Sequence, residues 1–367
     1  MKKIFIVIGT RPEVIKMAPI IQALQASIWA HPFVVVTGQQ RELLEQTMQI
    51  FKLSADANLD LMTTNQTLAA LTARLSAALD NLLEREKPDV VLAQGDTTSV
   101  FVAALTAFYR KIPFGHVEAG LRTKNIHNPF PEELNRVLVS RMTTWHFTPT
   151  ENTKRNLLDE LIPEKDIYVT GNTVIDALLS VKNITNFNRA NYNLTNKKLL
   201  LLTAHRRESF GGPLVEICEA VLELCELRKD IQFLIPVHPN PNVQSVLFDK
   251  LGSKKEITLT QPFNYLEFIG AMNAADLILT DSGGVQEEAP ALGKPVLVLR
   301  ENTERLEAVS AGVVKLVGTN RQKIVSSVCN ILENPAEYNK MTLGGSPYGD
   351  GYAASRISEI LRVYFSS

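Results

Sequence analysis

Short apolar runs alternate with segments of helical periodicity along nearly the whole of this 367-residue chain. Mainly apolar runs typical of strands occupy residues 4–8, 33–36, 90–93, 114–117, 145–148, 167–170, 199–202, 233–236, 257–259, 277–279, 296–299 and 313–316. Apolar residues recur at helical spacing in segments such as 14–24, 68–86, 98–109, 214–227 and 287–292. Strands without polar alternation are buried on both faces, so the pattern predicts an α/β protein with doubly wound parallel sheets.

The number of strands predicts two domains. A dozen strands are more than one twisted parallel sheet normally holds, and a chain of 367 residues suits two domains better than one. The best boundary lies near Gly171, which gives an N-terminal Rossmann-like domain over residues 1–170 and a C-terminal one over residues 171–352. A final helix over 353–367 follows a turn-rich stretch, and we expect it to return to the first domain.

The near-equal numbers of acidic and basic residues argue against some classes of binding partner. There are 38 basic and 39 acidic residues, so the net charge of −1 offers no basic field for nucleic acid or an anionic membrane. No run of about 18 apolar residues is present, and the apolar part of residues 1–9 is short for a signal peptide. Three cysteines without metal spacing are typical of a reducing compartment. The sequence therefore predicts a cytoplasmic protein that binds neither nucleic acid nor a membrane.

A small-residue turn follows the apolar run at 277–279 and opens a predicted helix. The segment over 281–290 reads Asp-Ser-Gly-Gly-Val-Gln-Glu-Glu-Ala-Pro. Glycines let a ligand approach bare backbone N–H groups at a helix N-terminus, and these groups attract phosphate. The glutamates just inside the helix, including Glu288, suit ribose hydroxyls. The segment favours a nucleotide site, and an ordinary polar helix cap is the alternative.

Two cations follow the first predicted strand. Residues 9–12 read Gly-Thr-Arg-Pro, a tight turn with a proline suited to the first turn of a helix. Arg11 and Lys16 therefore lie near a helix N-terminus, where anions are favoured and an arginine can hold two phosphate oxygens. Two solvated cations are the alternative.

Three carboxylates follow strands or open helices of the first domain. Asp96 and Glu118 come directly after predicted strands, and Glu132 opens a helix behind two prolines. The carboxyl ends of parallel strands meet at one edge of a sheet, so these side chains should converge. Converging carboxylates can divide acid and base roles between them. Asp96 and Glu132 could instead cap helices, whereas Glu118, directly after a buried strand, is harder to explain in that way.

The second domain carries histidines in the same kind of position. His205, with Arg206 beside it, follows the strand at 199–202, and His238 follows the strand at 233–236. These groups can neutralise a diphosphate, although a lone histidine is more often structural. The chain has no Walker A loop, no Gly-x-Gly-x-x-Gly after the first strand and no cluster with zinc spacing.

The ordered set of motifs closely resembles the bacterial non-hydrolysing UDP-N-acetylglucosamine 2-epimerases. The resemblance rests on Gly-Thr-Arg-Pro-Glu at 9–13, Gly-Asp-Thr-Thr at 95–98, His-Val-Glu-Ala-Gly-Leu-Arg at 116–122, Pro-Glu-Glu at 131–133, His-Arg-Arg-Glu at 205–208, Asp-Ser-Gly-Gly-Val-Gln-Glu-Glu at 281–288 and Ser-Pro-Tyr-Gly-Asp-Gly at 346–351. It extends over essentially the whole chain. It implies a GT-B-type fold, in which two Rossmann-like domains face a central cleft that holds the substrate.

The resemblance also implies a reaction. Members of this family convert UDP-N-acetylglucosamine to UDP-N-acetylmannosamine, which supplies N-acetylmannosamine for bacterial surface polysaccharide. The anomeric C–O bond breaks with loss of the C2 proton, which gives UDP and 2-acetamidoglucal. UDP then adds back while a proton reaches the other face of C2. Inversion through an alkene implies no cofactor and no metal, and the family implies a homodimer.

The family's functional residues match positions of this chain. The resemblance implies acid–base or active-site roles for Asp96, Glu118, Glu132 and His205. It implies contacts with the UDP-sugar for Arg11, Lys16, Arg136, Phe268, Ser282, Gly283, Gly284 and Glu288. Which carboxylate removes the proton and which returns it stays open.

Many bacterial members of the family also bind a second UDP-N-acetylglucosamine as an activator beside the active site. The residues that match this activator site are Gln39, Gln66, Glu133, Arg206 and His238. Gln40, Glu42 and Asn65 depart from the residues found in other members, and Leu306 replaces a proline.

Other functions fit parts of the pattern. A 2-epimerase of a related UDP-linked amino sugar would share the motifs, and a hydrolysing 2-epimerase would release free N-acetylmannosamine. A retaining GT-B glycosyltransferase would share the nucleotide site but would need an acceptor. A catalytically silent UDP-sugar sensor would need only the nucleotide half, so the three carboxylates argue against it.

Overall fold

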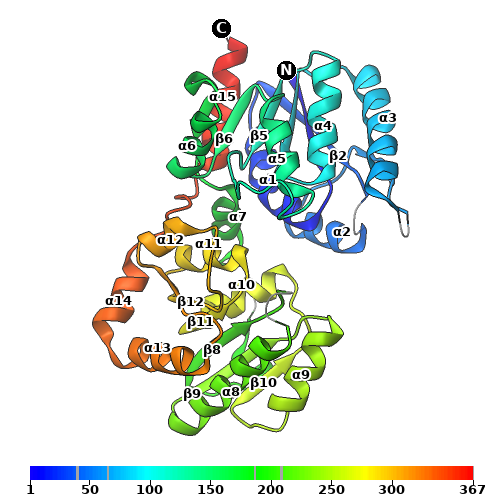
Figure 1. Cartoon of the computed structure of the whole chain (residues 1–367). Coiled ribbons are helices and arrows are strands. Elements are labelled where there is room, and N and C mark those ends of the chain that lie inside the picture. Colours follow the sequence, from blue (N-terminus) through cyan, green and yellow to red (C-terminus); the bar gives the residue numbers. More distant parts are fainter. Residues whose placement is uncertain (39–40, 64–65, 186, 207–209, 367) are drawn as a thin grey trace. The chain divides into compact units, whose positions relative to one another are not determined.

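The computed structural model describes residues 1–38, 41–63, 66–185, 187–206 and 210–366, without the side chains of 41–43. The chain divides into two compact units (Figure 1). Unit 1 comprises Met1–Ala177 and Tyr348–Ser367, and unit 2 comprises Leu178–Pro347. Each unit contains one parallel sheet with helices on both faces, which confirms the predicted α/β class.

Unit 1 is built on a seven-stranded parallel sheet with the order β3-β2-β1-β4-β5-β6-β7. Its elements are β1 (Lys2–Ile8), α1 (Arg11–Gln25), β2 (Ala30–Val36), α2 (Arg41–Ile50), β3 (Ala57–Asn58), α3 (Leu68–Glu86), β4 (Val90–Gln94), α4 (Thr98–Tyr109), β5 (Phe114–Val117), α5 (Glu132–Ser140), β6 (Trp145–Thr148), α6 (Glu151–Asp159), η1 (Glu164–Asp166), β7 (Ile167–Val169), α15 (Ala353–Ser366) and the first part of α7 (Thr173–Val181), which the boundary between the units divides. The order reverses at β1, which pairs with β2 on one side and β4 on the other. Crossovers leave such a point in opposite directions, and open parallel sheets generally bind ligands outside the carboxyl ends of the strands there, which are here β1 and β4.

The core of unit 1 follows from the apolar runs of the sequence. Residues Ile4–Ile8 of β1 are almost wholly buried, and Phe5 stacks on Phe33 of β2 with ring centroids 4.6 Å apart. On α3, leucines spaced three and four residues apart form one buried face against the sheet. Strand β3 was not predicted, because only two of its residues pair with β2 and so short a segment carries no periodicity.

The C-terminal helix α15 belongs to unit 1, where it packs against α1. Asp176 of α7 accepts hydrogen bonds from the first backbone N–H groups of α15, at 3.3 Å and 2.9 Å. Near the other end of the helix, Tyr364 meets the Trp145 ring edge-on with centroids 4.7 Å apart. Phe365 lies against Trp29 with centroids 6.3 Å apart. The last segment of the chain therefore completes the packing of the first.

Unit 2 is built on a six-stranded parallel sheet with the order β10-β9-β8-β11-β12-β13. Its elements are η2 (Arg189–Tyr192), β8 (Lys198–Thr203), α8 (Gly212–Leu227), β9 (Ile231–Pro236), α9 (Pro241–Leu251), β10 (Ile257–Thr260), α10 (Tyr265–Ala274), β11 (Leu277–Thr280), α11 (Gly283–Ala291), β12 (Val296–Val298), α12 (Leu306–Ser310), β13 (Val314–Leu316), α13 (Arg321–Glu333) and α14 (Pro335–Leu343). Strand β8 lies between β9 and β11, so the polar residues that follow β8 and β11 are neighbours.

Two cysteines, seven residues apart on α8, lie in the core of unit 2. Cys218 and Cys225 are buried in the cluster that α8 forms with the sheet. Burial raises the pKa of Cys218 to about 12 and that of Cys225 to about 11, so both thiols stay protonated. In the parts of the chain that the structure describes, no helix combines the length and the apolar character needed to cross a membrane.

Candidate functional site

The carboxyl ends of β1, β4 and β5 bring together the residues predicted for unit 1. Arg11 is the first residue of α1, and Lys16 lies on the second turn of that helix. Asp96 follows β4, and Glu118 follows β5. Because these three strands are neighbours in the sheet, one edge carries two cations and two carboxylates.

Glu118 is held in a fixed position at this edge. Its side chain is buried, and one carboxylate oxygen lies 2.5 Å from Nζ of Lys16 and 3.0 Å from Nδ2 of Asn172. The other oxygen accepts a hydrogen bond from the side chain of Gln94. The backbone of Glu118 has a φ of 63°, which is costly for a residue with a side chain. Such a conformation persists where the surroundings fix it, and here it aims a carboxylate at Lys16.

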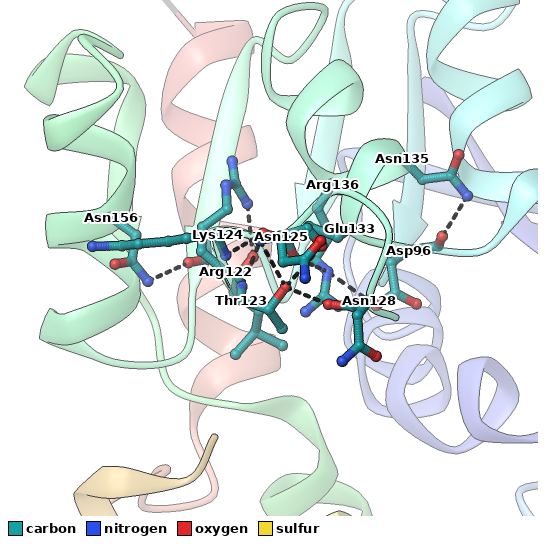
Figure 2. Close-up of polar contacts among 12 residues, drawn as sticks. Asp96, Arg122, Thr123, Lys124, Asn125, Asn128, Glu133, Asn135, Arg136 and Asn156 are labelled. Atoms are coloured by element: carbon teal, nitrogen blue, oxygen red, sulfur yellow. Dashed lines mark hydrogen bonds and ion pairs between the residues drawn. The ribbon is translucent and has the colours of Figure 1, made fainter. Parts of the chain in front are cut away.

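Asp96 lies in an acidic environment that is partly compensated by cations (Figure 2). Oδ2 of Asp96 is 3.5 Å from Nε of Arg136, and its backbone carbonyl accepts a hydrogen bond of 2.8 Å from Asn135. Burial raises the pKa of Asp96, and Glu118 and Glu132 raise it further, while Arg136 and Lys16 lower it. The three carboxyls predicted from the sequence therefore lie close enough to influence one another.

Glu133 holds the loop before α5 and does not reach solvent (Figure 2). Its side chain is 1% exposed, and Oε1 accepts the backbone N–H groups of Thr123 and Lys124 at 2.8 Å and 2.9 Å. Oε2 lies 3.2 Å from Nε of Arg136. Glu133 thereby ties the segment that follows Glu118 to the helix that carries Glu132 and Arg136.

Arg122 anchors the same loop from its other side. Its guanidinium makes two hydrogen bonds to Glu160, at 2.6 Å and 2.9 Å, and one of 2.8 Å to Ser140. Nearby, Nδ2 of Asn156 donates a hydrogen bond of 2.9 Å to the backbone carbonyl of Gly120. The sequence marked Arg122 only as part of a motif, and its buried contacts indicate that it supports the loop.

In unit 2, Asp281 organises the turn that follows β8. The buried carboxylate accepts the backbone N–H groups of His205 and Arg206, both at 2.9 Å. Nδ1 of His205 lies 3.5 Å from the other oxygen, and its ring stacks on that of His238 with centroids 5.3 Å apart. Burial lowers the pKa of His205, and Asp281 opposes this shift. His205 is therefore held by a carboxylate on one side and an imidazole on the other.

The N-terminus of α11 has the properties of an anion site. Ser282 is the N-cap residue, and Gly283 and Gly284 open the helix, so their backbone N–H groups have no partners within it. A Cβ on Gly283 would lie 3.4 Å from Cζ of Arg305 and 3.5 Å from a terminal nitrogen of Arg206. Two guanidinium groups thus lie beside the bare backbone of this turn.

Arg305 was not predicted as a site residue. It lies in an irregular segment between β12 and α12, and its Nε donates to Glu287 at 2.9 Å. The sequence signal that could have found it is the Thr-Glu-Arg stretch at 303–305, a polar cluster shortly after a buried strand. That stretch was noted only because Leu306 departs from the family pattern.

Glu288 and Phe268 lie in unit 2 near one buried phenol. Glu288 is buried on α11, and its charge together with burial holds the pKa of Tyr265 well above the usual value, burial being the larger cause. Tyr265 and Phe268 are three residues apart on α10, so they share one face of that helix. Phe268 is half-buried.

The residues predicted for an activator site are only partly described. Gln39, Gln40 and Asn65 lie outside the described residues, and so does the side chain of Glu42. Gln66 is engaged by Arg74 and by Thr63, whereas His238 is exposed and accepts a hydrogen bond of 3.2 Å from Asn240. Among the described side chains, no group of three or more His, Cys, Asp or Glu is arranged to hold a metal ion.

Comparisons with known proteins agree on one family. The family model for UDP-N-acetylglucosamine 2-epimerase matches residues 22–362. A UDP-N-acetylglucosamine 2-epimerase of Yersinia pestis is 49% identical over 98% of both chains, and that of Escherichia coli K12 is 48% identical over the same share. The crystal structure of the Neisseria meningitidis UDP-GlcNAc 2-epimerase bound to UDP-GlcNAc is 47% identical, covers 98% of this chain and 99% of its own, and has a TM-score of 0.88.

Proposed function

Because the chain belongs to the UDP-N-acetylglucosamine 2-epimerase family, we propose that it interconverts UDP-N-acetylglucosamine and UDP-N-acetylmannosamine by inverting C2 of the sugar. The observation that carries this proposal is the group of Asp96, Glu118 and Glu132 at the carboxyl edge of the first sheet, with Lys16 and Arg136 beside it. Inversion at a carbon next to the anomeric centre requires one proton to be removed and another to be delivered, and carboxyls can do both.

We propose that the reaction proceeds by elimination and re-addition of UDP. A carboxylate takes the C2 proton, the C–H electrons form the C1–C2 double bond, and the anomeric C–O bond breaks with its electron pair on UDP. The reverse sequence delivers a proton to the opposite face of C2 and gives the epimer. The raised pKa of Asp96 favours a protonated carboxyl, while the ammonium of Lys16 beside Glu118 favours a charged one. This difference supports an acid role for Asp96 and a base role for Glu118.

The second unit supplies groups suited to UDP as a leaving group. The backbone N–H groups of Gly283 and Gly284, in the turn that Ser282 caps, and the guanidinium groups near Gly283 can hold the diphosphate as its charge develops. His205 adds a hydrogen-bonding group on the neighbouring turn. Glu288 is proposed to accept the ribose hydroxyls, and Phe268 to contact the uracil. This assignment involves neither a metal nor a redox cofactor.

An NMR time course in heavy water tests the proposal. With UDP-N-acetylglucosamine, the purified chain should form UDP-N-acetylmannosamine that carries deuterium at C2, without accumulation of free sugar. Lasting free N-acetylmannosamine and UDP would instead identify a hydrolysing enzyme. No change would contradict the proposed substrate, and a panel of related UDP-linked amino sugars would then distinguish another epimerase from a transferase that awaits an acceptor.

We further propose that the product feeds bacterial surface polysaccharide in the cytoplasmic stage of its synthesis. The support is chemical, because a UDP-activated amino sugar is the form in which glycosyltransferases take up a sugar. Sugar analysis of the cell envelope after deletion of the gene should show the loss of N-acetylmannosamine or of the residues made from it. An unchanged composition would contradict this role.

A second UDP-N-acetylglucosamine is proposed to act as an activator through Gln39, Gln66, Arg206 and His238, with the buried Glu133 acting through the loop that it holds. The stack of His238 on His205 supports it, because a ligand at His238 would contact a residue of the proposed active site. With UDP-N-acetylmannosamine as the sole substrate, the initial rate should rise when a trace of UDP-N-acetylglucosamine is added. An initial rate that stays the same when UDP-N-acetylglucosamine is added would contradict activation.

The chain is also proposed to form a homodimer through α4 and α5 of unit 1. These helices contact each other and carry exposed apolar residues, Phe108 and Tyr109 on α4 and Leu134 and Leu138 on α5. Exposed apolar patches on folded proteins commonly mark an interface. The L138E variant is expected to shift the mass in light scattering from dimer to monomer. A wild-type chain that is monomeric at micromolar concentration would refute the proposal.

Removing Arg305 is expected to weaken UDP binding. The R305A variant loses one charged donor beside Gly283, and a hydrogen bond to a charged group contributes about 1.5–3 kcal/mol, so the Kd for UDP should rise roughly 10- to 100-fold. Isothermal titration calorimetry measures it. The control is R321A, which removes a guanidinium of unit 2 that pairs with Glu223 at 2.5 Å and should leave the Kd unchanged. Unaltered UDP affinity in R305A would remove Arg305 from the site.

A further inference from the structure

The turn between β1 and α1 is enclosed by residues of two neighbouring turns. Strand β1 is flanked by β2 and β4, so the segments that follow these strands meet around Gly9. A Cβ on Gly9 would lie 2.8 Å from Oγ of Ser99 and 3.0 Å from Oγ1 of Thr37, and these hydroxyls are 3.0 Å apart. The backbone of Gly9 therefore rests directly on this pair of buried hydroxyls.

Glu13 closes the same turn from its helical side. Its side chain is 2% exposed, and Oε2 accepts the backbone N–H groups of Gly9 and of Thr10, the latter at 3.3 Å. The Thr97 hydroxyl also lies near enough to favour the charged carboxylate. Thr97 directly follows Asp96 in the turn after β4, so this carboxyl links the turn that precedes Arg11 to the turn that carries Asp96.

Burying the carboxyl group of Glu13 at the start of α1 costs free energy, because the group loses its hydration. Burial raises the pKa of Glu13 to about 7, against the hydrogen bonds from the turn, which lower it. Its second oxygen, Oε1, has no hydrogen-bond partner among the described residues. A buried polar atom in that condition costs stability. Glu13 is also the third residue of a capping box with Thr10, but a carboxylate in contact with water could serve that box, so capping alone does not account for the cost of burial.

We propose that Glu13 is a positioning residue that fixes the β1–α1 turn against the β4–α4 turn and so sets the spacing of Arg11 and Asp96 around the reacting sugar nucleotide. The inference rests on the proposed function. Glu13 is enclosed behind the turn, so it acts through the backbone of Gly9 and Thr10 and does not touch the substrate. Displacement of catalytic groups by about 1 Å can reduce turnover roughly 100-fold.

Three variants separate positioning from general destabilisation. E13A removes both backbone contacts and should lower kcat/KM about 10- to 100-fold. E13Q keeps an oxygen that accepts the same N–H groups and should restore kcat/KM to within about threefold of wild type. The matched control is D89A, because Asp89 joins the same two strands at their opposite end, where Oδ2 accepts the N–H of Lys3 at 2.8 Å. D89A should lose stability and keep its kcat/KM.

Thermal unfolding followed by tryptophan fluorescence is measured on each variant, since Trp29 and Trp145 both lie in unit 1. If E13A does not fold, the kcat/KM of E13D is measured in its place. Aspartate keeps the charge of Glu13, but it is one methylene too short to reach both N–H groups. Folded E13A or E13D with wild-type kcat/KM would overturn the inference, as would an equal loss in D89A. A wild-type chain that leaves UDP-N-acetylglucosamine unchanged would instead overturn the proposed function.

Discussion

The E118Q variant is expected to lose roughly 10²- to 10⁴-fold in kcat for C2 epimerisation while it stays folded. Glu118 is buried, and its oxygens contact Lys16, Gln94 and Asn172. Glutamine can occupy the same space, so the fold should persist. It cannot take a proton from C2, and it leaves the ammonium of Lys16 without its 2.5 Å carboxylate partner. Among single substitutions of the site we expect the largest loss of activity here.

The measurement is the rate of deuterium incorporation at C2 together with kcat. The surface variant E164Q removes a carboxylate that pairs with Lys154 at 2.8 Å, and it should behave as wild type. D96N and E132Q extend the series, since both carboxyls influence the proposed centre. If E118Q, D96N and E132Q all kept full turnover, the catalytic assignment of the carboxylates would be wrong.

Acid is expected to destabilise unit 1 well before its surface carboxylates are fully protonated. His116 of β5 and His146 of β6 are register partners in the sheet and are each 1% exposed. Burial lowers the pKa of His116 to about 4 and that of His146 to about 3. Nε2 of His116 lies 2.7 Å from the carbonyl oxygen of Gly95, and neither Nδ1 has a hydrogen-bond partner among the described residues.

The direction of the effect follows from the lowered pKa values. The unfolded chain binds a proton at each histidine near pH 6.5, whereas the folded chain resists protonation until about pH 4 or below. Stability is therefore fully present above pH 6.5 and is lost as the pH falls toward 4. Each histidine should contribute a loss on the order of 3 kcal/mol over that window.

Urea unfolding at a series of pH values checks this expectation. Tryptophan fluorescence follows unit 1, because both tryptophans of the chain lie there. H146Q should flatten the dependence of the free energy of unfolding on pH between 6.5 and 4, whereas H31Q, at an exposed position, should not. A free energy that stays level across this window in the wild type would show that these imidazoles are charged or solvated in the fold.

The sequence predicted those parts of the site that directly follow strands. Asp96 and Glu118 come immediately after runs of buried apolar residues, so the edge of the sheet that carries them could be read from local pattern and the geometry of parallel sheets. The turn at Ser282 was recognisable for the same reason. Strand β3, in contrast, consists of two residues whose pairing depends on the neighbouring strand.

Roles that depend on contacts distant in sequence were not predictable. Glu133 was assigned from the resemblance to an activator site, yet the structure shows its carboxylate bonded to the backbone of Thr123 and Lys124. Arg305 lies in irregular chain, where no periodicity marks a side chain as aimed at Gly283. In the sequence, Glu13 stood out only as part of the Gly-Thr-Arg-Pro-Glu motif. Its hydrogen bonds with the backbone of Gly9 and Thr10 follow from the folded β1–α1 turn.

The place of α15 in unit 1 bears on how the chain is made. Along the chain, the strands of unit 1 come before all of unit 2, and the helix that packs on α1 comes after it. A growing chain therefore holds Trp29 and Trp145 without their aromatic partners Phe365 and Tyr364 until unit 2 has been translated. A premature stop codon within α15 would therefore damage unit 1, which is translated before unit 2.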